Sequence, residues 1–139
     1  MHIDLHGPIG IESYSRDKFF ILFVDDYSRM MIVMYLKEKS KALQKFEWYM
    51  ARVEKETRKR VKWLRSDRGG EFIWNEFNNF CIERGIKRHV STPWTPEKNG
   101  IGKRRNRSIM DCAITLMIEK NISIKYWKEA INIVVHTLN

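Results

Sequence analysis

Two continuous runs of apolar residues occur in the first quarter of the chain. FFILFV covers residues 19–24 and MMIVMYL covers residues 30–36. Runs of this length without polar alternation are typical of strands that are buried on both faces. The DDYS turn at residues 25–28 predicts that these two strands form a hairpin. Weaker strand patterns cover three short segments, residues 1–5, 61–64 and 86–90.

Apolar residues that recur every three or four positions predict helices in the middle of the chain. The first stripe covers residues 41–57, with Ser40 as its N-cap. Its members are Leu43, Phe46, Met50 and Val53. A short helix follows, which Asn75 caps and Gly85 closes. Its apolar residues are Phe77, Phe80 and Cys81.

A long helix and a final helix are predicted near the end of the chain. Residues 91–100 contain Pro93, Pro96 and Gly100 and are expected to form a loop. The long helix covers residues 101–119, with these inward positions: Ile109, Cys112, Ala113 and Leu116. The last helix starts at about residue 124, with this apolar stripe: Ile124, Trp127, Ile131, Val134 and Leu138. The stripe is still apolar at the last residues, so we expect residues 1–139 to be one domain that is truncated at its C-terminal end.

The order of these elements predicts a single α/β domain. A length of 139 residues suits one domain. Three strands come first, and then a helix, a strand, a helix, a strand and the last helices. Hairpin connections early and helical crossovers later predict a mixed sheet with helices on both faces.

The charge balance indicates a polyanionic partner. Lys and Arg number 26 against 17 Asp and Glu, which gives a formal net charge of +9. Such an excess favours nucleic acid over a merely solubilising surface. Cys81 and Cys112 form no CxxC pair, and His2 and His6 have no second ligand pair nearby, so a zinc site is not expected. With no apolar run of roughly 18 residues and no signal peptide, the sequence predicts a nuclear or cytoplasmic protein.

Two aspartates are placed for metal chemistry. Asp4 lies in the first predicted strand, and Asp67 follows the fourth. Sites in open α/β sheets gather at strand ends, and neighbouring carboxylates are the hard oxygen ligands that Mg²⁺ prefers. Two such ions would activate a nucleophile and stabilise the leaving oxygen in phosphodiester chemistry. An aspartate after a strand is also a common turn residue, so each of the two alone is explained without a metal.

Three further carboxylates compete for that role. Asp25 and Asp26 fall in the hairpin turn, where turn chemistry explains them. Glu71 follows Asp67 closely, behind two glycines that permit a tight turn. We therefore expect Glu71 to support the site rather than to bind metal.

Six motifs occur in an order that resembles one protein family. They are HIDLHGPI, FVDDYSRMMIVMYLKEKS, LRSDRGGEF, FNNFCIERGI, STPWTPEKNGIGKRRNRS and YWKEAI. Together they resemble the integrase catalytic core of copia-type LTR retrotransposons, with plant elements nearest, and they cover nearly the whole chain. The resemblance implies a ribonuclease H-like fold. It also implies a triad of two aspartates and a glutamate that holds Mg²⁺ or Mn²⁺.

The resemblance places the catalytic triad on Asp4, Asp67 and position 103. Thirty-five residues lie between Asp67 and position 103, as the family pattern requires, but the residue there is Lys103. An ammonium offers three donors and no lone pair, so it competes with metal for the two aspartates instead of binding it. Glu97 in the preceding loop is a poor replacement, because a mobile loop does not fix a ligand. The departure predicts a weak or inactive enzyme.

A basic cluster surrounds the same position, and its members are Lys98, Lys103, Arg104, Arg105 and Arg107. Such a run is often only a solvated helix face. Helix-start amides favour phosphate, however, and with the resemblance they predict contacts to the nucleic-acid backbone that depend on salt. Trp94 either stacks on a base or packs within its loop. The other tryptophans considered, Trp48, Trp63 and Trp127, are expected in the core or in an interface.

Two functions of different classes follow from these observations. The first is an integrase core for DNA integration by metal-dependent strand transfer between element ends and target DNA, impaired by Lys103. The second is a non-catalytic nucleic-acid-binding module. A ribonuclease that cleaves RNA–DNA hybrids shares the fold class, but the motif set argues against it. The resemblance also implies a homodimer, whereas neither a membrane nor a small-molecule substrate is expected.

Overall fold

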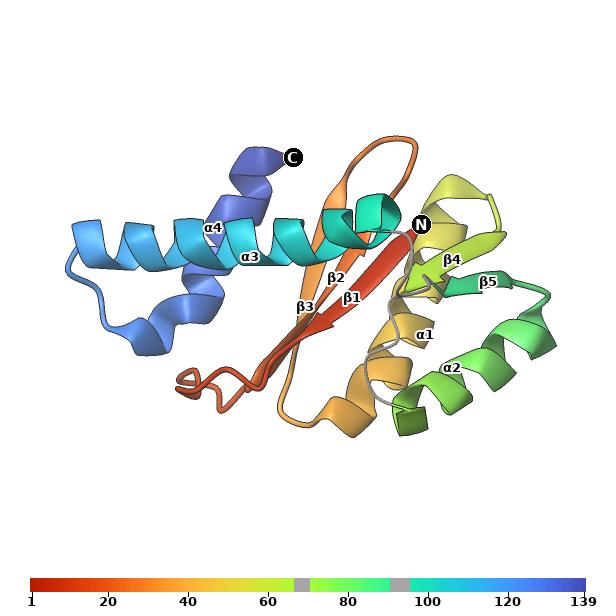
Figure 1. Cartoon of the computed structure of the whole chain (residues 1–139), viewed down its shortest axis with the longest axis horizontal. Coiled ribbons are helices and arrows are strands. Elements are labelled where there is room, and N and C mark those ends of the chain that lie inside the picture. Colours follow the sequence, from red (N-terminus) through yellow and green to blue (C-terminus); the bar gives the residue numbers. More distant parts are fainter. Residues whose placement is uncertain (67–70, 91–95) are drawn as a thin grey trace.

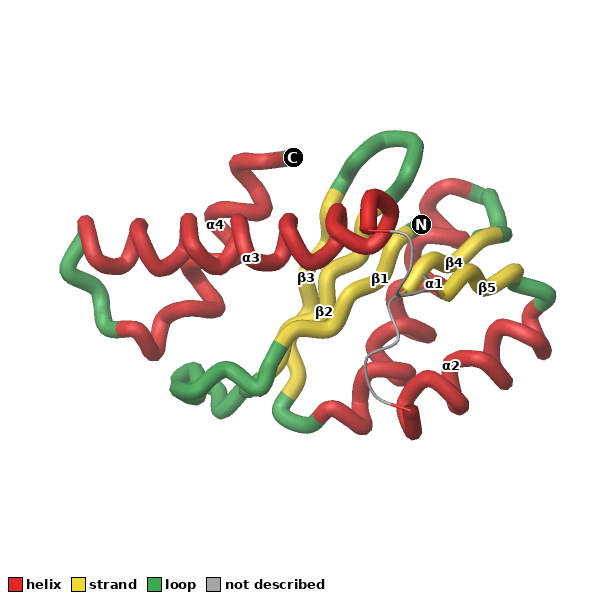
Figure 2. The backbone as a smooth tube through the Cα atoms, viewed as in Figure 1, coloured by secondary structure: helices red, strands yellow, loops and turns green. Residues whose placement is uncertain are grey.

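The structure is a computed structural model that describes the backbone of residues 1–66, 71–90 and 96–139. Side chains are described within residues 1–66, 75–90 and 104–139. The elements, drawn in Figures 1 and 2, are β1 (His2–His6), β2 (Phe19–Val24), β3 (Met31–Leu36), η1 (Lys39–Lys41), α1 (Ala42–Thr57), β4 (Trp63–Ser66), α2 (Glu71–Arg84), β5 (Lys87–Val90), α3 (Pro96–Glu119), η2 (Ile124–Tyr126) and α4 (Trp127–Leu138).

The five strands form one mixed sheet in the order β3-β2-β1-β4-β5. β1, β2 and β3 are antiparallel neighbours, whereas β1, β4 and β5 run parallel. The hairpin of β2 and β3 pairs Phe19 with Leu36 and Val24 with Met31. The predicted mixed sheet and its order of strands and helices are therefore confirmed.

Helices cover both faces of the sheet, and β2 shows why its sequence is continuously apolar. Ile21 and Phe23 belong to a core cluster with residues of α1 and α2. Phe20 and Leu22 point to the opposite face and belong to a second cluster with residues of α3 and α4. Successive side chains of a strand alternate between faces, so a strand between two helical layers needs apolar residues at every position (Figure 1).

The predicted N-caps of the first two helices are wrong. Ser40 lies inside η1, and its hydroxyl bonds to Glu38 rather than to the start of α1. The Lys41 amide already donates to the Glu38 carbonyl, so a 3₁₀ turn precedes α1 and leaves no capping role for Ser40. Asn75 lies within α2, which begins at Glu71. Gly85 follows α2 as predicted, with a φ of +67° that glycine adopts readily.

The third α-helix begins earlier than predicted, at Pro96 instead of Ile101. Proline is favoured in the first turn of a helix, because its missing N–H would have no partner there. The proline therefore marks the start of α3 and not a loop. The inward stripe also differs, since Cys112 is exposed. Among the described side chains of α3, the buried ones are Asn106, Ile109, Ala113 and Met117.

The predicted stripe of the last helix is confirmed at its centre and wrong at its ends. Its buried members are Trp127, Ile131 and Val134. Ile124 lies in η2 and Leu138 in the last turn of α4, and they are 41% and 57% exposed. Trp127 is thus a core residue, as expected. Trp48 and Trp63 do not lie in the core, since they are 55% and 51% exposed.

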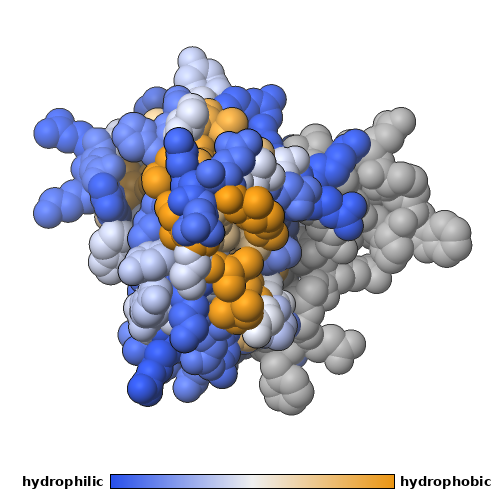
Figure 3. Space-filling view, turned by 90° about the vertical axis from the view of Figure 1, so that its left-hand side faces the viewer, coloured by the Kyte–Doolittle hydropathy of each residue, from blue (hydrophilic) through white to orange (hydrophobic). Residues whose placement is uncertain are grey.

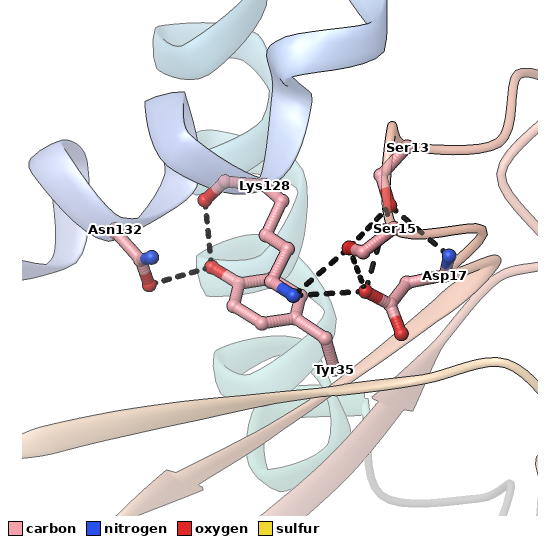
Figure 4. Close-up of polar contacts among 6 residues, drawn as sticks. All are labelled: Ser13, Ser15, Asp17, Tyr35, Lys128 and Asn132. Atoms are coloured by element: carbon pink, nitrogen blue, oxygen red, sulfur yellow. Dashed lines mark hydrogen bonds and ion pairs between the residues drawn. The ribbon is translucent and has the colours of Figure 1, made fainter.

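A polar cluster fastens the segment after β1 to α4 (Figure 4). Asp17 is 6% exposed, and its carboxylate accepts hydrogen bonds from the Ser15 hydroxyl at 2.6 Å and the Lys128 ammonium at 2.9 Å. The Tyr35 hydroxyl, from β3, lies 2.8 Å from the Lys128 carbonyl and 2.7 Å from Asn132 Oδ1, and it donates to one of them. The cluster therefore joins three segments that are distant in the sequence.

One end of the molecule carries exposed aliphatic side chains, where α3 turns into η2. They are Ile118, Ile122 and Ile124, with exposed fractions of 73%, 44% and 41%. Figure 3 faces this end and shows an apolar group at its centre, surrounded by hydrophilic residues. Among the described residues, no helix is both long and apolar enough to cross a membrane.

Candidate active site

A contact between β1 and α3 defines the candidate site. Asp4 lies at the centre of β1, where it pairs with Leu22 of β2. Asn106 lies in α3 and is 2% exposed. Its Nδ2 donates a hydrogen bond of 2.6 Å to Asp4 Oδ2. The two residues are 102 positions apart, so the fold and not the local sequence brings them together.

The Asn106 amide leaves its own oxygen buried, and this Oδ1 has no hydrogen-bond partner among the described residues. Turning the amide over would place that oxygen against the Asp4 carboxylate, so the assigned orientation is the one that avoids two facing acceptors. A buried acceptor without a partner costs about 1–3 kcal/mol. A buried polar side chain with a spare acceptor is a candidate for a specific contact, which singles out Asn106 beside Asp4.

β4 ends beside Asp4. β1 and β4 run parallel, and Ile3 pairs with Ser66. These are the residues that come directly before Asp4 and Asp67. Asp67 itself lies outside the described residues, so its predicted role as a metal ligand stays a prediction.

Position 103 belongs to α3, one turn before Asn106. Residues three positions apart share a face of an α-helix, and Asn106 marks the face that meets β1. Position 103 therefore lies on the side of α3 that faces the sheet near Asp4. The Lys103 side chain lies outside the described residues, as do those of Glu71 and Glu97, and the roles predicted for all three stay predictions.

Part of the predicted basic cluster is described. Arg104 and Arg107 are exposed and Arg105 is half-buried. The remaining members of the predicted nucleic-acid-binding set lie outside the described side chains: Trp94, Lys98 and Lys103. The described arginines place positive charge on α3 on either side of Asn106, next to the candidate site.

Positive charge also surrounds His2, two positions before Asp4 on the same face of β1. Burial is the main reason that the pKa of His2 lies below its usual value, and the charges of the N-terminal ammonium, Arg65 and Arg105 lower it further. Asp26 opposes this effect, because its Oδ1 lies 2.9 Å from His2 Nε2. Two arginines from different elements, β4 and α3, therefore lie close to the same part of β1.

Turn chemistry accounts for Asp25, as predicted. Its carboxylate accepts hydrogen bonds from the hydroxyl and the main-chain N–H of Ser28, at 2.7 and 2.8 Å. These bonds hold the pKa of Asp25 below its usual value. Asp26 is engaged with His2 instead. Neither carboxylate is needed to explain the Asp4 site.

The described residues alone do not make up the metal site of three carboxylates that the resemblance implies, because Asp67 and the side chain at position 103 lie outside them. In the described part of the chain, no group of three or more His, Cys, Asp or Glu side chains is placed to hold a metal ion. At the candidate site the described oxygen donors are the Asp4 carboxylate and the buried Asn106 amide oxygen. Mg²⁺ demands a nearly octahedral shell of oxygens, and a charged lysine at position 103 supplies none.

Sequence reasoning missed Asn106. It stands inside the basic run KRRNRS, where its neighbours point to a solvated or DNA-facing helix surface. The available sign was its spacing, because Asn106 lies three positions before the inward Ile109. Extending the inward stripe by one turn reaches a polar residue, and a polar residue at a core position is a candidate for a specific contact.

Comparison with known proteins identifies the family. A family model described as integrase core domain matches residues 1–96. The chain belongs to the integrase core domain family. This agrees with the resemblance in the sequence motifs.

Three curated relatives are retrovirus-related Pol polyproteins of plant transposons. The chain is 36% identical over 139 residues to that of transposon TNT 1-94 of Nicotiana tabacum, which covers 100% of this chain and 10% of the relative. It is 30% identical over 131 residues to that of transposon RE2 of Arabidopsis thaliana, and 31% identical over 131 residues to that of RE1. These two alignments cover 94% and 93% of this chain and 9% of each relative. The chain thus spans about a tenth of the length of the polyproteins it matches.

Solved structures confirm the fold class. A chain of a simian T-cell lymphotropic virus intasome, solved with the PP2A regulatory subunit B56 gamma, aligns with a TM-score of 0.69 and 16% identity, over 99% of this chain and 48% of that one. The catalytic core domain of BIV integrase aligns with a TM-score of 0.57 and 19% identity, over 99% and 82%. The ribonuclease H-like fold predicted from the motifs is therefore correct.

Proposed function

We propose that this chain is the integrase core of a transposon Pol polyprotein that serves DNA integration, and that Lys103 leaves it with weak or no strand-transfer activity. Family membership and the plant-transposon relatives support the first part. The contact between Asn106 and Asp4 supports the second part, because position 103 lies one turn before Asn106 on α3. A glutamate there would add a carboxylate to the site, and Lys103 adds a cation.

Divalent-metal binding tests the role of Lys103 directly. Mn²⁺ affinity of the chain is measured by titration calorimetry for the unmodified protein, Lys103→Glu and Lys103→Gln. We expect Lys103→Glu to bind at least about tenfold more tightly, which is about 1.4 kcal/mol. Lys103→Gln should fall between the two, since it removes the cation without adding a carboxylate. Adding Asp4→Asn to Lys103→Glu should abolish the gain.

Strand transfer tests the activity itself. The chain, supplied with the flanking integrase segments, is assayed for joining a labelled DNA end to a target plasmid in Mg²⁺ or Mn²⁺. The unmodified chain should give little or no product, and Lys103→Glu should increase it. Robust joining by the unmodified chain, lost on Asp4→Asn, would show that Lys103 does not disable the site.

A non-catalytic DNA-binding module is the second candidate, which the net charge of +9 and the exposed Arg104 and Arg107 favour. Binding through phosphates should weaken steeply as salt rises. For this function the affinity should be unaffected by a chelator and by Asp4→Asn, whereas a metal-dependent site predicts that both change it. The homodimer and a nuclear or cytoplasmic site of action remain part of the proposal, and sedimentation equilibrium of the chain tests the dimer.

A further inference from the structure

The two parallel strands at one edge of the sheet carry an exposed group of cationic and aromatic side chains. β4 exposes Trp63 and Arg65, and β5 exposes Lys87 and His89. The register pairs Trp63 with Lys87 and Arg65 with His89, so all four side chains share one face. We name these four residues the β4–β5 platform. The opposite face of β4 is closed, since Leu64 is fully buried in the core with α1 and α2.

The β4–β5 platform lies on the same face of the sheet as the candidate site. Arg65 pairs with His2 of β1, and His2 and Asp4 are two positions apart on one strand, so they point to the same side. Asp4 pairs in turn with Leu22, which faces the α3 and α4 layer. His2, Arg65 and His89 therefore form a row across three strands that leads away from Asp4.

The helices on that side of the sheet pack elsewhere. α3 contacts β1 and α4 contacts β3, and Figure 1 shows α4 and most of α3 away from β4 and β5. Trp63 consequently stays 51% exposed. Its ring has one described cationic neighbour, the Lys87 ammonium at 5.1 Å from the ring centre. A tryptophan left half open on a sheet face is unusual, because a large aromatic side chain normally gains stability by burial.

The charge of this surface selects the class of ligand. Arg65 and Lys87 are cations and none of the four residues is acidic. Exposed Lys62 precedes the platform, and Arg105 of α3 acts on the same His2 as Arg65. The acid near this row, Asp26, is engaged with the Met1 ammonium at 2.8 Å and with His2. Cations around an exposed aromatic ring are the combination that binds single-stranded nucleic acid, in which unpaired bases stack and phosphates meet the cations.

We propose that the β4–β5 platform binds a single-stranded segment of DNA next to the Asp4 site, with one base stacked on Trp63 and phosphates held by Arg65 and Lys87. The choice of DNA rests on the proposed function. The platform extends the predicted nucleic-acid contacts from the first turns of α3 onto the sheet itself. It also gives Trp63 a role that burial does not supply.

Matched tryptophan variants test the proposal. Binding of a fluorescently labelled 15-nucleotide oligothymidylate is followed by anisotropy for the chain, Trp63→Ala, Trp63→Phe and Trp48→Ala. Trp48 is the control, because it is 55% exposed on α1 and also has a cation near its ring, Arg52 at 5.6 Å. Trp63→Ala should weaken binding about tenfold or more, as loss of a base stack does. Trp63→Phe should restore most of the affinity, and Trp48→Ala should change it less than twofold.

The salt dependence separates phosphate contact from stacking. Lys87→Gln should reduce the slope of log K against log salt by about 0.7, the value for one phosphate contact on a single strand. Trp63→Phe should leave that slope unchanged. A blunt duplex of equal length should be much less sensitive to Trp63→Ala, because its bases are not available for stacking. Circular dichroism melts confirm that each variant is folded.

The outcomes distinguish this proposal from the proposed function. If the unmodified chain binds neither single-stranded nor duplex DNA, the DNA-binding part of the proposed function is wrong. If it binds DNA and Trp63→Ala binds equally well, the β4–β5 platform is a solvated edge or a protein contact and the further inference is overturned. Equal losses for Trp63→Ala and Trp48→Ala would overturn it as well, since stacking would then not be specific to this face.

Discussion

Asn106 Nδ2 donates a hydrogen bond of 2.6 Å to Asp4 Oδ2 and so links α3 to the central strand of the sheet. The donor is neutral, so it satisfies one oxygen of the Asp4 carboxylate without cancelling the negative charge. A cation in the place of the Asn106 amide would satisfy this oxygen and also cancel the charge of the carboxylate. The Asn106 contact by itself therefore leaves the negative charge of Asp4 available to other groups at the site.

Replacing Asn106 by aspartate tests this contact. Asn106→Asp keeps the shape of the side chain but places a second carboxylate within hydrogen-bond distance of Asp4. Like charges at this distance raise the pKa of one of them. A group whose pKa is raised in the folded state leaves stability intact at low pH and reduces it as pH rises. We expect a loss of at least about 1.4 kcal/mol at pH 7, the equivalent of one pKa unit, and almost none at pH 4.

Urea denaturation at the two pH values measures this loss. Asn132→Asp is the matched control, since Asn132 lies on exposed α4 surface and contacts the Tyr35 hydroxyl rather than a carboxylate. Its effect should not grow between pH 4 and pH 7 in the same way. A loss for Asn106→Asp that is equal at both pH values would show that the side chain matters only for packing.

The β2–β3 hairpin could be predicted from the sequence, because the residues that specify it are neighbours in the chain. FFILFV and the DDYS turn predict β2 and its hairpin partner without knowledge of the rest of the fold. Pro96 misled the prediction of α3, because the same residue is suited to a loop and to the first turn of a helix. Context outside the segment decides between the two.

The candidate site was predicted only in part, for a similar reason. Asp4 could be proposed from its strand and its motif. Asn106 could not, because its role depends on α3 crossing β1 at that residue, which no local pattern specifies. Trp63 was likewise expected in the core or an interface, and its exposure depends on which strands α3 and α4 leave uncovered. Apolar character says that a side chain can be buried, and the layout of the helices decides whether it is.

The aromatic cluster around Phe46 of α1 should contribute a large part of the free energy of unfolding. Phe46 is fully buried, and its ring centre lies 5.1 Å from that of Phe77 and 5.6 Å from that of Phe80. Phe46→Ala removes these contacts and leaves a cavity, so we expect a loss of about 3–5 kcal/mol in the free energy of unfolding. Tyr27→Ala should change it by less than about 0.5 kcal/mol, because Tyr27 is 97% exposed. Urea denaturation of both variants measures the difference. Similar effects of the two substitutions would contradict the assignment of this core.

The burial of Tyr49 should make the free energy of unfolding fall at alkaline pH. Its ring stacks on Phe23 with centres 4.1 Å apart, and burial, helped by the charge of Asp25, raises the pKa of Tyr49 to about 12. The neutral phenol is therefore favoured in the folded state, and its contribution is complete below pH 10 and is lost as pH rises. Relative to Tyr49→Phe, the unmodified protein should lose about 1 kcal/mol between pH 9 and pH 11. The free energy of unfolding of the unmodified protein minus that of Tyr49→Phe should therefore fall from pH 9 to pH 11. A constant difference would mean that Tyr49 ionises as freely in the folded chain as in the unfolded one.

Acid should weaken the cluster that ties the segment after β1 to α4. Burial alone would raise the pKa of Asp17, but hydrogen bonds from Ser15 and Lys128, together with the lysine charge, outweigh it and hold the pKa below its usual value. A carboxyl group with a depressed folded-state pKa contributes stability above its unfolded pKa of about 4, and that contribution is lost as pH falls through the folded value. Asp17→Asn should thus lower the free energy of unfolding by about 2 kcal/mol at pH 7, and its difference from the unmodified protein should disappear below pH 4.

Glu12→Gln is the control, because Glu12 forms an exposed ion pair with Lys18 that should contribute little. If the two substitutions cost the same at pH 7, the Asp17 cluster does not fasten α4 to the sheet.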